Sequence, residues 1–323
     1  MNNAKKLVKN NTIWVVLIII FIVAAIISPN FLSFSNLISV VQTESVVGVI
    51  AAGTMWCILS AGIDLSAGSM VAFASCIVAS FVQKAGYSGA MYPNMQAPII
   101  VGIILAVLFC MIFGFMNGWL VAYTKIHPFI ATLGSQLIVR AAAQIYTNAY
   151  PVPELRDEFK FLGQGLVGPI PMIVIIFAIF MVISGFMLNY TRFGKNVFAI
   201  GGNVDAARAA GIKVEKNLVI VYVWASVCAA FAGVLLAARS GAGNSSFGLN
   251  YELDSIAACT IGGTSQRGGV ARITGVIAGI FILGIIKNIM LLMGVNAYWQ
   301  QVVKGAIIII AVVIDMRKTA KKN

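Results

Sequence analysis

The chain has 323 residues, of which 60% are hydrophobic and 10% are charged, and its formal net charge is +12. Soluble domains carry about 25% charged residues, so this composition excludes an ordinary water-soluble domain and predicts an integral membrane protein. The positive charge does not indicate nucleic-acid binding. It gathers at the two ends and in one central segment, as in the cytoplasmic segments of membrane proteins.

Apolar runs alternate with short polar breaks, and in order they predict an all-α protein with about ten transmembrane helices. The runs are 13–27, 46–59, 70–82, 98–123, 129–146, 171–188, 218–237, 251–261, 273–293 and 299–314. A basic lead before the first run is also typical of a signal peptide, but the many later runs favour an uncleaved helix. Residues 31–41 are mildly amphipathic and are expected at the membrane interface. The run 251–261 is too short to span and predicts a half-helix or re-entrant element.

Lysine and arginine cluster in three segments: residues 1–12, 191–217 and 315–323. By the positive-inside rule all three are cytoplasmic, and both termini inside require an even number of spans. The loop 147–168 also carries acidic residues and is expected outside. We therefore predict one transmembrane domain over residues 1–323, with a cytoplasmic lead, central loop and tail.

Two breaks in the apolar pattern resemble each other. GIDLSAGS contains Asp64 and YELDSIAACTIGG contains Asp254, each beside serine and small residues. Each break follows the second run of its half of the chain. With five runs per half, the halves would have opposite orientations, so the pattern suggests an inverted repeat with a pathway between the halves.

The central loop contains the signals of a short helix. Gly201-Gly202 predicts a turn, Asn203 is a good N-cap, and Asp205 lies in the first turn, where the helix dipole favours an anion. Gly211 can adopt the left-handed conformation that ends the helix. The expected helix has a small alanine-rich surface and would fit a groove on another protein. From the residues alone, a solvated loop with an incidental helix remains the alternative.

The sequence contains no motif for nucleotide binding or hydrolysis: G-x-x-x-x-G-K-[ST], H-E-x-x-H and G-x-S-x-G are all absent. We predict no catalytic residue and no cofactor, so the energy for active transport would come from an ion gradient or another subunit. Five cysteines without ligand spacing and a single histidine, His127, predict neither disulfides nor a metal site.

Polar residues at membrane depth are mostly neutral. They suit a polar, uncharged solute that exchanges water for hydrogen bonds to the wall. For any one of them, packing between helices is the alternative interpretation. Arg140 and Lys287 are interpreted first as paired or snorkelling structural charges. The candidate translocation path consists of Asp64, Ser66, Asn117, Thr132, Gln136 and Asp254.

Five motifs resemble a known family: SAGIDLSAGS, HPFIATLG, TRFGKNVFAIGGN-x-x-AARAAGI, YELDSIAAC-x-IGGTS-x-x-GG and YWQ-x-x-VKGAIIIIAV-x-x-D. In this order they cover nearly the whole chain. They look like the permease subunits of bacterial monosaccharide ABC importers of the ribose/galactose/xylose class. YELDSIAAC and the YWQ stretch look closest to the galactose/methyl-galactoside members.

The resemblance implies a homodimer in the bacterial inner membrane, with about ten spans per copy. It also implies an extracytoplasmic sugar-binding protein and a cytoplasmic ATPase with two nucleotide-binding cassettes. The central helix would then dock in a cleft of the ATPase. The coupling residues would be Gly201, Gly202, Asn203, Asp205, Ala207, Arg208 and Gly211.

Two other functions stay open at this point. The first is a stand-alone, ion-coupled secondary carrier of a small polar solute, which is motivated by Asp64 and Asp254 at the breaks. The second is a membrane-embedded enzyme, although the sequence shows no assembled catalytic constellation.

Overall fold

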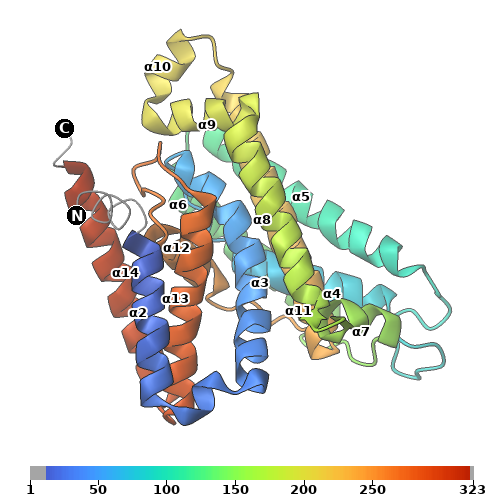
Figure 1. Cartoon of the computed structure of the whole chain (residues 1–323). Helices are drawn as coiled ribbons and strands as arrows, with labels where there is room; N and C mark the ends of the chain where they lie inside the picture. Colours follow the sequence, from blue (N-terminus) through green and yellow to red (C-terminus); the bar gives the residue numbers. More distant parts are fainter. Residues whose placement is uncertain (1–11, 321–323) are drawn as a thin grey trace.

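The computed structural model describes residues 12–320, and helices make up most of that part of the chain (Figure 1). In chain order they are α2 (Thr12–Ile27), η1 (Pro29–Leu32), α3 (Phe34–Leu59), α4 (Ala67–Phe81), α5 (Ile99–Tyr123), α6 (Pro128–Thr147), α7 (Asp157–Gln164), α8 (Met172–Tyr190), α9 (Arg192–Gly202), α10 (Val204–Ala209), α11 (Val214–Ser240), α12 (Tyr251–Ile261), α13 (Ile273–Leu292) and α14 (Ala297–Ala320). Two short antiparallel strands, β1 (Leu166–Val167) and β2 (Ile170–Pro171), form a hairpin between α7 and α8. The predicted basic lead falls almost wholly outside the described residues, and so do the last three residues of the predicted tail.

Six of these helices are long and apolar enough to cross a membrane by length and composition: α3, α5, α8, α11, α13 and α14. Two more, α2 and α4, are apolar but shorter. The prediction of an all-α membrane protein is therefore confirmed. The predicted runs 129–146 and 251–261 correspond to α6 and α12, which are not among these eight helices.

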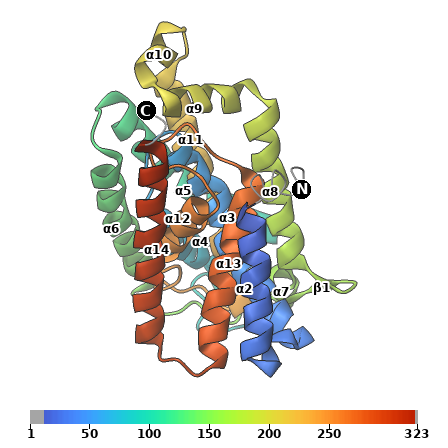
Figure 2. The same cartoon turned by 60° about the vertical axis from the view of Figure 1, so that its left-hand side comes forward.

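The long helices run roughly along one axis, so the molecule has two ends (Figures 1 and 2). The short helix α10 projects at one end, which we call the α10 end. Helix α7 and the turn η1 lie toward the opposite end, which we call the α7 end. Helix α2 starts on the side of the α10 end and runs away from it, and α14 runs back toward it.

Helix α11 forms the centre of the bundle and packs against α3, α4 and α5. Small residues allow this close approach, as is usual between membrane helices. A β-carbon at Gly53 of α3 would lie 2.7 Å from the Cα of Ala225, and one at Gly114 of α5 would lie 2.8 Å from the carbonyl oxygen of Tyr222. Both neighbours are backbone atoms of α11, which have little freedom to move.

We expect Gly114→Val to destabilise the protein by about 3 kcal/mol, because overpacking against backbone costs about that much. The measurement is the thermal unfolding midpoint of the purified chain in detergent. Gly134→Val on α6 is the matched control, since a β-carbon there has open space. Equal midpoints for the two variants would contradict the close packing of α5 on α11.

Three elements differ from the sequence-based expectations. Helix α3 is continuous from Phe34 and so includes most of the segment expected at the interface; Ser33 caps it by accepting a hydrogen bond from the backbone N–H of Asn36. In the central loop, residues 192–202 form α9, so Gly201-Gly202, predicted as a turn, is instead the last part of this helix. Thr191 caps α9 by accepting a hydrogen bond from the N–H of Gly194 at 3.1 Å. The predicted external loop contains α7. Two of these helices begin at a hydroxyl N-cap, α3 at Ser33 and α9 at Thr191, and α7 has Asp157 and Glu158 in its first turn.

Candidate functional site

Helix α10 has the caps that its sequence predicts. The side chain of Asn203 accepts hydrogen bonds from the N–H groups of Asp205 at 3.0 Å and Ala206 at 2.9 Å. Gly211 follows the helix in the left-handed region, at φ +80°. The helix ends at Ala209. Local chemistry alone therefore defines this element.

One side of α10 is packed, and the residues on its other side are exposed. Ala207 is buried against Ile200 and Val214. Arg208 bridges to Glu215 at 2.7 Å and to Asp205 at 3.8 Å, so its guanidinium anchors α10 to the start of α11. The remaining predicted coupling residues, Gly202, Asn203, Asp205 and Gly211, are exposed.

Gly201 is buried at the end of α9, where two interruptions of the bundle meet. A β-carbon there would collide with the carbonyl oxygen of Leu59 and lie 2.6 Å from the nitrogen of Gly269. That nitrogen donates to the same Leu59 oxygen at 2.9 Å. Leu59 is the last residue of α3, and Gly269 lies in the loop between α12 and α13. The end of α9 thus contacts the end of α3 and the loop after α12, whereas a β-carbon on Gly202, the next residue, would have open space around it.

The first break is held by a buried polar network. Asp64 accepts hydrogen bonds from the N–H of Ser66 at 2.8 Å and from its hydroxyl group. Asn117 of α5 donates to the Ser66 hydroxyl oxygen at 3.0 Å. The hydroxyl group of Thr132 on α6 donates to the carbonyl oxygen of Pro128 at 2.8 Å and lies 3.4 Å from the carbonyl oxygen of Ile63. Four of the six predicted path residues, Asp64, Ser66, Asn117 and Thr132, therefore converge on one point, and all four are buried.

A fifth predicted path residue, Gln136, lies one turn along α6 and reaches a different element. Its amide donates to Glu252 of α12 at 3.4 Å. One turn further, a single guanidinium nitrogen of Arg140 donates to the carbonyl oxygens of Ser245 at 2.7 Å and Phe247 at 2.6 Å. The polar face of α6 therefore holds the loop that precedes α12.

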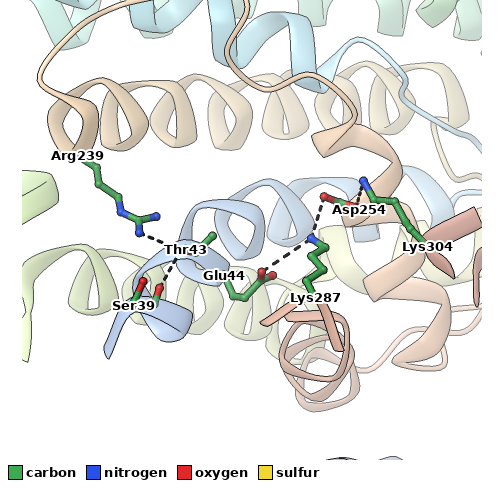
Figure 3. Close-up of polar contacts among 7 residues, drawn as sticks. All are labelled: Ser39, Thr43, Glu44, Arg239, Asp254, Lys287 and Lys304. Carbon is green, nitrogen blue, oxygen red and sulfur yellow. Dashed lines mark hydrogen bonds and ion pairs between the residues drawn. The ribbon is translucent and has the colours of Figure 1, made fainter. Parts of the chain in front are cut away.

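The sixth, Asp254, belongs to a separate cluster of charges between α3, α12, α13 and α14 (Figure 3). Its carboxylate oxygens lie 3.0 Å from the ammonium of Lys287 and 2.6 Å from that of Lys304. Lys287 also lies 3.8 Å from Glu44. The side chains of Asp254 and Glu44 are only 6% and 4% exposed, so the two carboxylates depend on these two lysines for compensation.

The charge cluster borders a cavity of about 440 Å³ at the ends of α3, α13 and α14 that lie away from α10. The cavity is also lined by neutral hydrogen-bonding groups: Ser39, Thr43, Asn250, Tyr251, Asn288, Gln300 and Gln301. A second cavity of about 650 Å³ lies along α14 on the side of the α10 end, with Thr260, Ser265 and Asp315 in its lining. Lys304 of α14 lines the first cavity, and Ile307 of the same helix lines the second. The two cavities are therefore about one turn of α14 apart.

At the α7 end, the start of α7 carries an exposed charge pair. Lys160 donates to Asp157 at 2.8 Å, and Lys84 lies 3.6 Å from the same carboxylate. The hydrogen bond from Lys160 and the charges of both lysines lower the pKa of Asp157, so its carboxylate stays ionised at more acidic pH than an unpaired aspartate.

Residues 36–312 match the family described as "Branched-chain amino acid transport system / permease component". The chain belongs to this family. The permease is 40% identical to the galactose/methyl galactoside import permease protein MglC of Haemophilus influenzae, over 100% of this chain and 98% of that protein. It is 38% identical to MglC of Escherichia coli, over 98% and 96% of the two chains, and 35% identical to the ribose import permease protein RbsC of the same organism, over 94% and 92%. The predicted resemblance to sugar permeases is confirmed, and no solved structure matches the chain.

Sequence reasoning missed part of the charge cluster of the permease. It considered Lys287 as a structural charge and Asp254 as a path residue without pairing them, and it did not consider Lys304. A signal was available, because an ionisable residue at membrane depth needs a partner. Two lysines and two carboxylates in otherwise apolar runs predict mutual pairing, although the sequence does not say which lysine meets which carboxylate.

We expect Arg140→Gln to release the loop 241–250, because two hydrogen bonds from a charged donor are lost, worth about 3 kcal/mol together. Hydrogen exchange of the backbone amides in this loop should speed up markedly, as read by mass spectrometry of the purified permease. Arg156→Gln is the matched control, since Arg156 donates to the carbonyl oxygen of Ala97 at 2.7 Å in another loop. If both variants affected the same loop, or if neither affected residues 241–250, the conclusion that Arg140 holds this loop would be ruled out.

Proposed function

We propose that the permease is the membrane-spanning subunit of an ATP-driven importer that moves a monosaccharide into the cytoplasm. The sugar would be a galactoside, such as galactose or methyl galactoside, or a ribose-like sugar. The supporting observation is the agreement with import permeases named for galactose/methyl galactoside and ribose over nearly the whole chain. ATP hydrolysis would be carried out by a separate cytoplasmic subunit with two cassettes, because the chain carries no nucleotide-binding motif.

In this proposal the α10 end is cytoplasmic, both termini are cytoplasmic, and ten helices cross or enter the membrane. They comprise the eight apolar helices together with α6 and α12, as one transmembrane domain of two inverted five-helix halves. Helices α4 and α12 would be the equivalent short helices of the two halves. Each lies at an interruption of the apolar pattern. Asp64 precedes α4 by three residues, and Asp254 lies in the first turn of α12.

Helix α10 would be the coupling helix that docks in the ATPase. The proposal rests on its exposed side, its own capping hydrogen bonds and the contact of Gly201 with the end of α3 and the loop after α12. Movement of α10 would be transmitted through α9 to the end of α3 and to the loop after α12. The residues that carry this role are Gly201, Gly202, Asn203, Asp205, Ala207, Arg208 and Gly211.

The translocation path would pass near Asp64, Ser66, Asn117, Thr132, Gln136 and Asp254, with the polar cavity beside Asp254 as its outer part. Two carboxylates paired with two lysines leave that cavity without net charge, which suits a neutral solute with many hydroxyl groups. An extracytoplasmic binding protein would deliver the sugar at the α7 end, and a second copy of the chain would complete a homodimer. Sodium- or proton-coupled transport by the permease alone is the competing function.

The experiment that separates the two functions uses the permease alone in liposomes. A proton or sodium gradient is imposed across the membrane, and labelled galactose or ribose is added outside the liposomes. An importer subunit without its partners should show no gradient-driven uptake. Uptake driven by a gradient would favour the carrier and would contradict the proposed dependence on an ATPase.

A further inference from the structure

A groove of about 860 Å³ lies at the α10 end, between the last turns of α5 and the first turns of α11. Its apolar wall includes Phe115, Trp119, Tyr123 and Ile220. The three aromatic side chains are 45% to 55% exposed, and the rings of Trp119 and Tyr123 stack with centroids 6.5 Å apart. This wall lies on helices that are apolar enough to span the membrane, so its natural surroundings are lipid.

Three lysines from two distant segments of the sequence line the same groove. Lys125 follows α5, Lys213 immediately precedes α11, and Lys216 lies in the first turn of α11. Lys125 has φ +58°, a backbone conformation that residues with side chains rarely adopt, so a strained turn holds it at the groove. Aromatic rings are typical contacts for lipid near the membrane interface, and lysines just beyond them are typical contacts for an anionic headgroup.

The start of α11 adds to the positive potential of the groove. Lys213 is the N-cap of this 27-residue helix, and its side chain accepts no capping hydrogen bond. The first N–H groups of such a helix carry partial positive charge. One acidic side chain, Glu215, also lines the groove, but Arg208 holds its carboxylate at 2.7 Å.

We propose that this groove binds an anionic phospholipid of the leaflet on the α10 side. The acyl chains lie against the aromatic wall, and the headgroup phosphate lies among Lys125, Lys213 and Lys216. A lipid fits better than a soluble anion, because most of the groove is apolar and only one end is basic. The site does not depend on the transported solute.

The test uses the full-length permease in phosphatidylcholine vesicles that contain brominated phosphatidylglycerol or, at the same mole fraction, brominated phosphatidylcholine. Bromine quenches the fluorescence of a tryptophan that it contacts. The quenching of Trp119 is obtained by subtracting the fluorescence of the Trp119→Phe variant from that of the unmodified permease in each lipid. Quenching of Trp119 should favour the anionic lipid by about tenfold, because several basic residues act on one phosphate. Lys125→Gln/Lys213→Gln/Lys216→Gln should abolish that preference.

Arg192→Gln/Lys195→Gln is the matched control, because it removes basic charge from α9 without touching the groove. It should keep the preference for phosphatidylglycerol. Equal quenching by both lipids, a preference that survives the triple substitution, or its equal loss in the control would each overturn the proposal. Displacement of the lipid by millimolar glycerol phosphate would also overturn it, since the site would then belong to a soluble anion.

Discussion

Gly202→Trp is expected to abolish ATP-driven uptake while the permease still folds and inserts into the membrane. Gly202 is exposed, and a β-carbon there has no atom within 4 Å in the part of the chain that the structure describes, so a larger side chain can leave this position without a clash at its base. If α10 docks in the ATPase, the same indole lies in the interface. A clash there costs about 2 kcal/mol or more, which lowers the affinity for the partner by about thirtyfold.

The measurement pairs sugar uptake by the reconstituted complex with co-purification of the ATPase. Gly202→Ala is the graded control, because a methyl group should be tolerated both by the fold and by a docked partner. Gly201→Ala differs from both, since its β-carbon collides with Leu59 and should lower stability as well as uptake. Normal uptake by Gly202→Trp would exclude α10 as the docking element.

Asp254→Asn is expected to have the second large effect. It leaves Lys287 and Lys304 with Glu44 as the remaining carboxylate of the cluster (Figure 3). Breaking a buried ion pair costs about 3–5 kcal/mol. The lower end applies here, because the lysine side chains are 28% and 20% exposed and water reaches them. The thermal unfolding midpoint in detergent should fall accordingly, and uptake should fall with it.

The double variant Asp254→Asn/Lys304→Met separates the loss of compensation from the loss of the carboxylate itself. It removes one of the two lysines, and Lys287 keeps Glu44 at 3.8 Å. The double variant should therefore recover part of the lost stability. A double variant no more stable than Asp254→Asn would show that Lys304 does not depend on Asp254, which would contradict the paired arrangement.

Features that depend on neighbouring residues could be predicted from the sequence. Asn203 caps α10 because its amide reaches N–H groups two and three residues on, and Gly211 ends that helix because a left-handed residue is needed there. The long helices could be predicted from the apolar runs, because the thickness of the membrane sets the length of an apolar helix that crosses it. These features do not depend on how the helices are packed.

Features that depend on tertiary contacts could not be predicted. The sequence grouped Asp254 with Asp64, because both lie near a break. Packing instead places Asp64 with Ser66 and Asn117, and Asp254 with two lysines from α13 and α14. The roles of Gly201 and Gly202 differ for the same reason. They are adjacent and chemically identical, yet one is enclosed by Leu59 and Gly269 while the other is open.

The central claim is that this permease imports a sugar only when an ATPase drives it through α10. The most direct measurement is uptake of labelled galactose and ribose into liposomes that contain the permease, with and without its ATPase, its binding protein and ATP. The account predicts uptake only when all components are present, and its loss in Gly202→Trp. Sugar uptake by the permease without the ATPase would contradict it.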